Sequence, residues 1–422
     1  MNDTLQNLMR EATRLTRSGQ LGEATRAIQR ALQGSRQSRG VGQVPDAAAS
    51  PGMNAPTAQE YRQDPIILDD CVFEVPQPAT AQPNAIMPET TFPQPRTPAA
   101  KHEGAFTEGS HTHASLTLRY KLYAPPGSAG GTGKSLPLVV MLHGCTQNPD
   151  DFAAGTGMNA LAREQGCYVL YPAQSADANP QRCWNWFKHT HQSRGRGEAA
   201  LLASMTLSIM QQHGIDARRV YIAGLSAGGA MAAIVAAAYP EIYAAVGVHS
   251  GLAVGAASNV AEALAAMRGG ANFGANVGEN IGENIGAKAF TGGSARNGQG
   301  GQQDHAGSAV PTIVFHGDQD RTVHPRNGEQ VCEQVIASVQ GGAGQSVTQD
   351  VEHGVSSGGR RFTRSVHRSG NGQTVAEHWR VNGAAHAWSG GHAPGSYTDP
   401  KGPDATGEML RFFLAHPHPK NP

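Results

Sequence analysis

Short runs of apolar residues recur along the second half of the chain. They fall at residues 139–142, 168–171, 220–223, 244–248 and 312–315, and Glu377–Val381 has the composition of a further strand. Runs that are apolar throughout are typical of parallel strands that helices cover on both faces. Stretches with helical spacing separate these runs, near 152–164, 198–213, 227–238, 258–267 and 328–339. The alternation predicts an α/β domain over residues 104–418, with a mostly parallel central sheet and helices on both of its faces.

Three segments depart from this alternation. Residues 1–34 carry apolar positions at helical spacing on either side of Ser18-Gly19, which predicts a short helical hairpin. Residues 35–103 are rich in Pro, Ala and Gln, so we expect a mostly disordered linker. Residues 268–308 are rich in Gly and Asn, which predicts a flexible insertion within the catalytic domain.

The charge balance excludes several classes of partner. Lys and Arg together number 33, as do Asp and Glu, so the chain lacks the basic field that nucleic-acid binding requires. It contains no run of 18 apolar residues, which predicts no transmembrane segment. The first 17 residues contain no uninterrupted apolar stretch, so we expect no signal peptide and a cytoplasmic or granule-associated location.

Neither a metal nor a cofactor is expected. The five cysteines form no Cys-x-x-Cys pair, which argues against a zinc ribbon or thioredoxin chemistry. The His-Thr-His sequences at 111–113 and 189–191 have no third ligand at a fitting spacing, so surface or strand histidines are favoured over zinc.

A candidate nucleophile follows the apolar run at 220–223. Gly224-Leu225-Ser226-Ala227-Gly228 matches the G-x-S-x-G turn, in which a sharp bend between a strand and a helix exposes the serine. Residues 354–358 match the same pattern around Ser356, but no helical pattern follows them. The context therefore favours Ser226.

A serine hydroxyl needs an adjacent base, and the base needs an acid to orient it. In the chain order Ser, acid, His, two aspartates follow the strand at 312–315, and we favour Asp320 over Asp318, which would brace the turn. His386 follows the strand at 377–381 in a Gly-flanked segment and is the predicted base. Its rivals lack this setting; they are His324, His353 and His392.

Two backbone N–H groups must meet the negative charge that develops on the substrate oxygen. One is expected from Ala227, directly after the nucleophile. The other is expected from the loop after the strand at 139–142, where Cys145 is the candidate.

Five motifs in this order carry a family resemblance. They are residues 143–147 (HGCTQ), 183–187 (CWNWF), 224–231 (GLSAGGAM), 316–323 (HGDQDRTV) and 386–391 (HAWSGG). The chain resembles the poly(3-hydroxybutyrate) depolymerase family of esterases, which also contains feruloyl and acetylxylan esterases. The resemblance spans roughly residues 104–416.

This resemblance implies an α/β-hydrolase fold and a serine carboxylic ester hydrolase that works through an acyl-enzyme. It implies Ser226, Asp320 and His386 as the triad, and the Cys145 N–H in the oxyanion hole. Cys145 and Cys183 are carried together by the resemblance, which favours a disulfide between them; two reduced thiols are the alternative. Trp184, Trp186 and Trp388 are expected to line the acyl groove or to pack in the core.

The substrate expected from the resemblance is poly(3-hydroxybutyrate) or hydroxyalkanoate oligomers, with feruloyl or acetyl esters as the near alternative. Many relatives are secreted, so an extracellular location is the alternative to the cytoplasmic one. Other interpretations are a catalytically silent interaction protein and a serine peptidase on the same fold. The hairpin of residues 1–34 is too small to bury its apolar stripe alone, so a polyester granule surface is a candidate partner.

Overall fold

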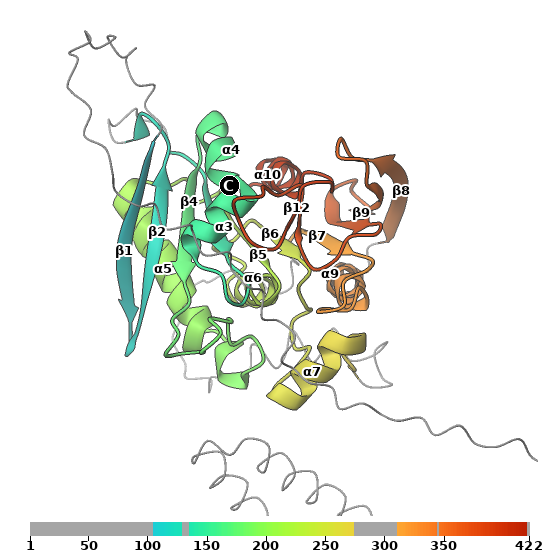
Figure 1. The fold of residues 1–422 in the computed structure, drawn as a ribbon, viewed down its shortest axis with the longest axis horizontal. Helices are drawn as coiled ribbons and strands as arrows, with labels where there is room; N and C mark the ends of the chain where they lie inside the picture. Colours follow the sequence, from blue (N-terminus) through green and yellow to red (C-terminus); the bar gives the residue numbers. More distant parts are fainter. Residues whose placement is uncertain (1–103, 129–134, 274–309, 344–345, 420–422) are drawn as a thin grey trace, which may run out of the picture. The chain divides into compact units, whose positions relative to one another are not determined.

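The computed structural model describes residues 104–128, 135–273, 310–343 and 346–419 (Figure 1). The hairpin predicted for 1–34 and the linker predicted for 35–103 lie outside these ranges, as does most of the insertion predicted for 268–308. Residues 268 and 269, at the start of that insertion, instead complete helix α7 (Val260–Gly269). No helix in the described part of the chain is both long and apolar enough to cross a membrane.

The described residues build a ten-stranded sheet in the order β1-β2-β4-β3-β5-β6-β7-β10-β9-β8. The six central strands, from β4 to β10 in this order, pair in parallel, whereas β1-β2-β4 and β10-β9-β8 pair antiparallel. The predicted α/β architecture with a mostly parallel central sheet is therefore confirmed. The strands are β1 Ala105–His113, β2 Leu116–Ala124, β3 Leu138–Leu142, β4 Tyr168–Ala173, β5 Val220–Leu225, β6 Ala245–His249, β7 Thr312–Gly317, β8 Val347–Val355, β9 Arg361–Ser369 and β10 Thr374–Val381, with the short pair β11 Trp388–Ser389 and β12 Thr398–Asp399.

Helices cover both faces of this sheet. One face carries the helices α5 (Gly197–His213), α6 (Ala227–Ala238), α7 and α9 (Arg326–Ala343). The other face carries α3 (Pro149–Thr156), α4 (Met158–Gln165) and α10 (Ala405–Ala415). Alternate residues of each strand enter the two cores, as β3 shows: Val140 faces one core and Met141 the other.

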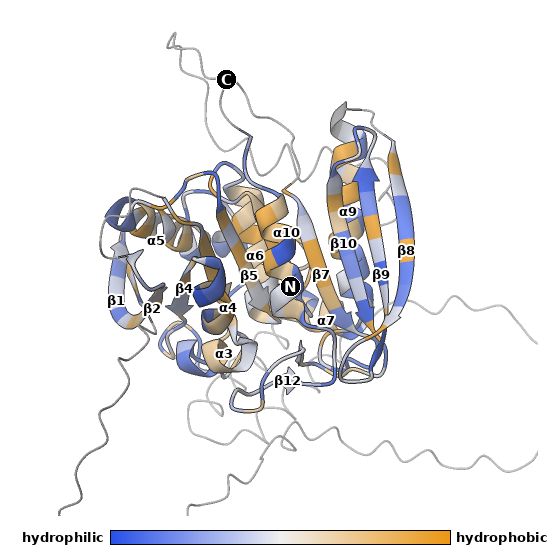
Figure 2. Cartoon of the chain, turned by 90° about the horizontal axis from the view of Figure 1, so that it is seen from above, coloured by the Kyte–Doolittle hydropathy of each residue, from blue (hydrophilic) through white to orange (hydrophobic). Residues whose placement is uncertain are grey.

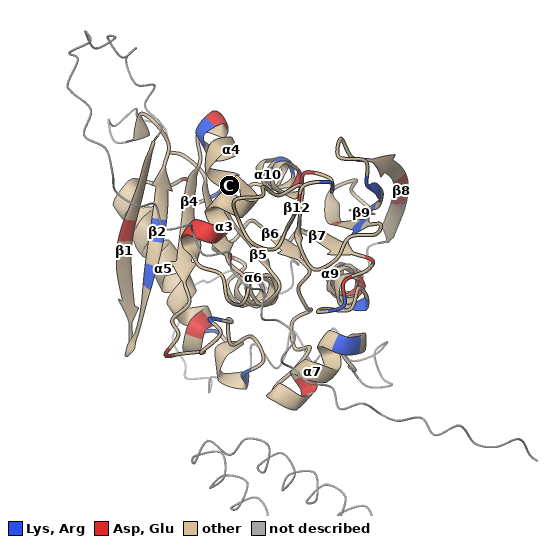
Figure 3. Cartoon of the chain, viewed as in Figure 1, with Lys and Arg blue, Asp and Glu red and all other residues tan. Residues whose placement is uncertain are grey.

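The central strands are apolar because both of their faces are covered. Strands β3, β5, β6 and β7 contain no Lys, Arg, Asp or Glu, whereas charged residues of both signs lie on the outer elements (Figure 3). Figure 2 shows the same gradient, with hydrophobic colour on β5 and β7 and largely hydrophilic colour on β8 and β9. The catalytic residues expected from the sequence therefore have to lie where these apolar strands end.

The single helix predicted near 152–164 is wrong in one respect, since the structure has two helices there. Gly157 lies between α3 and α4 in the left-handed region at φ 64°, which ends the first helix and begins the second. The side chain of Asn148 caps α3 by accepting the N–H groups of Asp150 and Asp151.

The start of α6 lies so close to the end of β3 that no side chain fits between them. A Cβ atom on Gly228 would overlap the carbonyl oxygens of Leu142 and His143. We expect Gly228→Ala to lower the free energy of unfolding by at least about 3 kcal/mol, at the upper end of overpacking effects. Urea unfolding measures this loss.

Gly269→Ala is the matched control, because a Cβ at the end of α7 would meet no atom within 4 Å. We expect this change to be neutral or to stabilise by up to about 1 kcal/mol. Equal losses in the two variants would contradict the close approach of α6 to β3.

Candidate active site

Ser226 lies at the junction of β5 and α6, and its backbone is strained. Its φ is 58° and its ψ is −120°, a combination that non-glycine residues rarely adopt. The flanking glycines permit the turn, since a Cβ on Gly224 would overlap the backbone of Gly228. Ser226 N–H donates to the carbonyl oxygen of His249 at 2.8 Å, which fixes the turn to the end of β6.

Asp320 and His386 are brought together by the loops that follow β7 and β10. Asp320 Oδ2 lies 2.7 Å from His386 Nδ1, so the imidazole donates from Nδ1 and leaves Nε2 for other chemistry. The other carboxylate oxygen, Oδ1, accepts the N–H groups of Thr322 and Val323 at 2.9 and 2.8 Å.

These contacts keep the Asp320 carboxyl charged. Burial alone would raise its pKa, but hydrogen bonds from the rings of His316 and His386 and from Val323 N–H outweigh burial and hold the pKa below its ordinary value. His316 Nε2 lies 3.5 Å from Asp320 Oδ2 and 2.8 Å from the carbonyl oxygen of Val323. A permanent negative charge thus lies beside the His386 ring.

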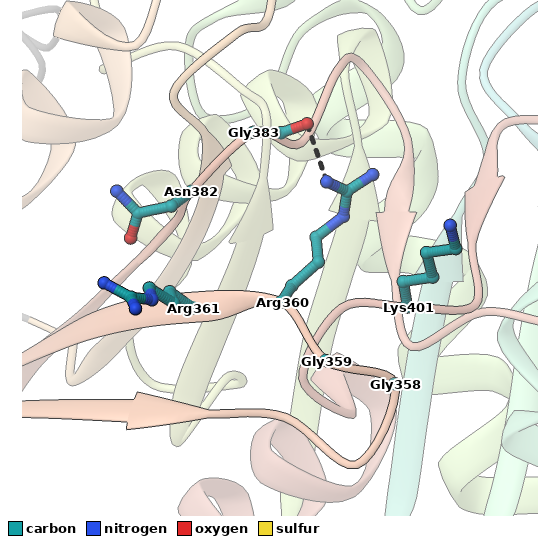
Figure 4. Close-up of a pocket in the computed structure, with 7 residues that line it drawn as sticks. All are labelled: Gly358, Gly359, Arg360, Arg361, Asn382, Gly383 and Lys401. Atoms are coloured by element: carbon teal, nitrogen blue, oxygen red, sulfur yellow. Dashed lines mark hydrogen bonds between the residues drawn. The ribbon is translucent and has the colours of Figure 1, made fainter.

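Asp318 has a different position. Its carboxylate accepts the Gly383 N–H at 2.7 Å and the Asn382 side-chain amide at 3.2 Å, and neither oxygen bonds to His386. Arg360 holds the same turn from outside by donating to the Gly383 carbonyl oxygen at 2.8 Å (Figure 4). Asp318 and Arg360 therefore brace the turn that leads to His386.

His249 connects the serine turn with the His386 segment, and the sequence analysis did not single it out. Its backbone oxygen accepts Ser226 N–H, while its ring Nε2 accepts Ser389 N–H at 2.9 Å. The ring also stacks on Trp388, with ring centres 5.0 Å apart. The signal that could have found it is its place directly after an apolar strand, where the polar groups of such sheets collect.

The structure contains no hydrogen bond between the Ser226 hydroxyl and His386 among the residues that it describes. Such bonds are often long or absent before a substrate binds. The backbone of Ser226 and the segment after His386 are nevertheless both held by His249.

The N–H groups expected to meet an oxyanion are those of Ala227 and Cys145. Ala227 opens α6, and the first N–H groups of a helix have no partner within it. On the loop after β3, Gly144 N–H donates to Gln147 Oε1 and Thr146 N–H donates to the Gln181 carbonyl oxygen. The N–H of Cys145, between them, donates to no other described residue.

The expected pairing of Cys145 with Cys183 is present as a disulfide in the structure. It joins the loop after β3 to the segment that contains Trp184. Among the described residues, the cysteines outside this bond are Cys167 and Cys332, and both are buried. Burial raises the pKa of Cys167 to about 11 and also raises that of Cys332, so these two thiols are protonated and enclosed.

The three tryptophans expected at the acyl groove lie in the core. Trp184, Trp186 and Trp388 are 0, 5 and 1% exposed. Trp184 Nε1 donates to the carbonyl oxygen of His143, and Trp388 Nε1 donates to the hydroxyl of Thr406. Their burial favours core packing, the alternative given by the sequence, over the lining of an acyl groove.

The rival serine and histidines are engaged elsewhere. Ser356 lies in the turn between β8 and β9, and its hydroxyl donates to the Lys401 carbonyl oxygen. None of the rival histidines bonds to Asp318 or Asp320; they are His324, His353 and His392.

A surface hollow of about 450 Å³ lies on the outer side of this region, and Figure 4 shows the residues that line it. Glycine backbone, Asn382 and the cations Arg360, Arg361 and Lys401 form its walls. Because a hydrocarbon-rich acyl group requires apolar walls, the hollow does not fit that role. The described residues also contain no group of three or more His, Cys, Asp or Glu that could hold a metal ion.

Residues 118–295 match the family model described as Esterase PHB depolymerase. Poly(3-hydroxyalkanoate) depolymerase C of Paucimonas lemoignei is 33% identical over 256 residues, which are 61% of this chain and 56% of that protein. Over this region the chain is similar to the PHB depolymerase family of esterases. Acetylxylan esterase A of Talaromyces purpureogenus is 28% identical over 225 residues, 53% of each chain. The chain spans little more than half the length of these two relatives.

The fold of the described domain is that of the α/β-hydrolases. An acetyl xylan esterase from Aspergillus awamori superimposes with a TM-score of 0.53 and 18% identity, covering 73% of this chain and 99% of that one. At this identity the likeness concerns the fold alone, and the predicted α/β-hydrolase class is confirmed.

Three buried histidines predict a loss of stability in acid. Burial lowers the pKa of His143 and of His378 to about 4 and of His249 to about 3. An unfolded chain binds these protons near pH 6.5, so the free energy of unfolding should fall as the pH decreases from about 6.5 towards 4. For His143 the loss amounts to roughly 3 kcal/mol. Urea unfolding at several pH values measures it.

His378→Gln removes one of the three groups and should make the decline with pH shallower. A free energy of unfolding that stays constant between pH 6.5 and 4.5 in the unmodified protein would show that these rings are not kept neutral by the fold.

Proposed function

We propose that the chain is a serine carboxylic ester hydrolase in which Ser226 is the nucleophile, His386 the general base and Asp320 the acid that orients it. The observation that carries the proposal is the 2.7 Å contact between Asp320 and His386, on loops beside the strained Ser226 turn. The similarity to this family supports the reaction class.

The proposed reaction has two stages. Ser226 Oγ attacks the ester carbonyl carbon while His386 Nε2 takes the hydroxyl proton, and the charge on the carbonyl oxygen meets the N–H groups of Cys145 and Ala227. The C–O bond to the alcohol then breaks, and His386 returns the proton to the departing oxygen. In the second stage water attacks the acyl-enzyme with His386 as base, which releases the acid and restores Ser226.

For the substrate, we favour poly(3-hydroxybutyrate) or hydroxyalkanoate oligomers, because the 33% identical relative is a poly(3-hydroxyalkanoate) depolymerase. Acetyl esters are the second candidate, since several relatives are acetylxylan esterases. Initial rates on hydroxybutyrate oligomers, acetylated xylan and ferulate esters separate these candidates.

The disulfide bears on where the protein works. Disulfides persist in oxidising compartments and are rare in the cytosol. Since Cys145 and Cys183 are bonded, we favour the extracellular alternative over the cytoplasmic location expected from the sequence.

The triad assignment is tested by substitution. Ser226→Ala should abolish hydrolysis of a p-nitrophenyl ester without loss of folding, since the hydroxyl makes no hydrogen bond to another described residue. Asp320→Asn should lower kcat by about 10³–10⁴-fold, because the amide no longer orients His386 as the carboxylate does. Asp318→Asn is the matched control and should cost less than about tenfold, since Asp318 bonds only to the turn at 382–383.

A larger loss in Asp318→Asn than in Asp320→Asn would reverse the assignment of the acid. A fluorophosphonate that labels the unmodified protein but not Ser226→Ala would exclude the catalytically silent alternative.

The N-terminal segment is proposed to serve attachment to the polyester surface. Deleting residues 1–103 removes nothing from the described domain, so the rate on a short soluble ester should stay within about twofold. Binding to polyhydroxybutyrate granules should weaken, because a second contact raises the effective concentration of the domain at the surface. Granule pull-down of the full-length and shortened chains measures this, and equal binding would contradict the proposed role.

A further inference from the structure

Glu198 is a buried carboxylate that takes no part in the proposed reaction. It lies in the first turn of α5, and its side chain is 4% exposed. It accepts the backbone N–H of Asn185 at 2.8 Å, the side-chain amide of Asn185 at 2.6 Å and the side-chain amide of Gln174 at 2.7 Å. His191 Nδ1 lies 3.5 Å from it. Both carboxylate oxygens are therefore occupied by donors from the segment that connects β4 with α5.

The same connecting segment holds the loop that carries Cys145. Gln174 uses its side-chain amide a second time, for the Cys183 carbonyl oxygen at 3.1 Å, and its backbone N–H donates to His143 Nε2 at 3.1 Å. Trp184 Nε1 donates to the His143 carbonyl oxygen at 3.0 Å. The disulfide joins Cys183 to Cys145 itself.

A charged carboxylate suits this position, and an amide does not. Burial would raise the pKa of Glu198, but the nearby His191 ring and the hydrogen bonds from Asn185 and Gln174 outweigh it and lower the pKa. The ionised group only accepts hydrogen bonds, as its donors require. The N-terminal end of α5 also favours a negative charge. A glutamine would turn N–H groups towards the N–H donors of Asn185 or Gln174.

We propose that Glu198 is a positioning residue for the oxyanion hole. It fixes the segments around Gln174 and Asn185, and these hold His143 and Cys183, and with them the N–H of Cys145, at the distance that the developing oxyanion needs. This inference rests on the proposed esterase function. Glu198 contacts neither the substrate nor the reacting atoms.

The test compares Glu198→Gln with Glu377→Gln in the full-length protein. Glu377, on β10, is the matched control. Its carboxylate is 3% exposed and forms salt bridges with Arg364 on β9 and Arg411 on α10. It pairs with Ile313, near the start of β7 and away from the strand ends that carry the site. Both variants should lose thermal stability, but only Glu198→Gln should lose catalysis.

The expected signature is specific to the oxyanion. In Glu198→Gln, kcat on a p-nitrophenyl ester should fall at least about tenfold with KM nearly unchanged, approaching the roughly 10²–10³-fold loss that follows removal of a donor. The inhibition constant of a boronic acid, whose tetrahedral adduct on Ser226 places an oxygen in the hole, should rise by a similar factor. Glu377→Gln should leave both quantities within about twofold.

Unchanged kcat and boronate affinity in a folded Glu198→Gln would overturn the proposal and leave the esterase function standing. An unmodified protein no more active than Ser226→Ala would overturn both. If Glu198→Gln does not fold, Gln174→Ala is the deciding variant, because it removes the side chain that connects Glu198 to Cys183. It should show the same fall in kcat at constant KM. An unchanged kcat in Gln174→Ala would overturn the proposal.

Discussion

The close approach of α6 to the end of β3 is the constraint on which the site depends. Gly228 lies against the carbonyl oxygens of Leu142 and His143, and Gly224 lies against Gly228. The tight turn between these two glycines places Ser226 at a positive φ of 58°. That conformation costs roughly 1–3 kcal/mol and persists only when its surroundings hold it. The surroundings do so with the hydrogen bond from Ser226 N–H to His249 and with the apolar cores that cover β5 and α6. The same approach brings the loop of Cys145 towards the first turn of α6, because that loop begins where β3 ends.

Polar groups at the strand ends are fixed by one another rather than by solvent. The loop after β3 is tied to the segments around Gln174 and Cys183, and the His386 segment is tied to His249 and to Asp318. The hydrogen bonds from Gln174 N–H to His143 and from Ser389 N–H to His249 are buried, and breaking either would leave a buried group unpaired at a cost of about 1–3 kcal/mol; the bond from Gly383 N–H to Asp318 is exposed. Loops held by such hydrogen bonds have fixed positions. N–H groups that stabilise an oxyanion must be in place before the reaction, and fixed loops meet this requirement.

Much of this arrangement could be predicted from the sequence, because it follows local patterns. Continuous apolar runs located the central strands, and the turn around Ser226 is a contiguous motif with a strict need for glycine. The choice of Asp320 over Asp318 could also be made from the sequence, since the residue farther from the strand end can turn back towards the histidine.

The edge strands β1, β2, β8 and β9 could not be predicted, because their half-exposed patterns resemble loops with charged residues. The roles of His249, Glu198 and Trp388 depend on partners far away in the chain, and no local pattern encodes such contacts. The burial of the tryptophans shows the same limit, since an aromatic residue near a motif can serve the groove or the core.

Three histidine rings lie near the Asp320 carboxylate: His316, His386 and His249. The hydrogen bonds of each ring indicate which one is available for the proposed role of general base. His249 Nε2 accepts Ser389 N–H, so its proton lies on Nδ1, towards Ser250, and a second proton would break the bond to the His386 segment. Burial and the neighbouring rings of His316 and His386 accordingly lower its pKa to about 3. His316 directs Nε2 at the carbonyl oxygen of Val323, and its Nδ1 is enclosed against Gly328, where no proton donor or acceptor among the described residues reaches it. Of the three, only His386 combines a 2.7 Å contact to Asp320 with a partly exposed side chain, at 12%. These contacts give His249 and His316 structural roles and leave His386 with one ring nitrogen available for the proposed role of general base.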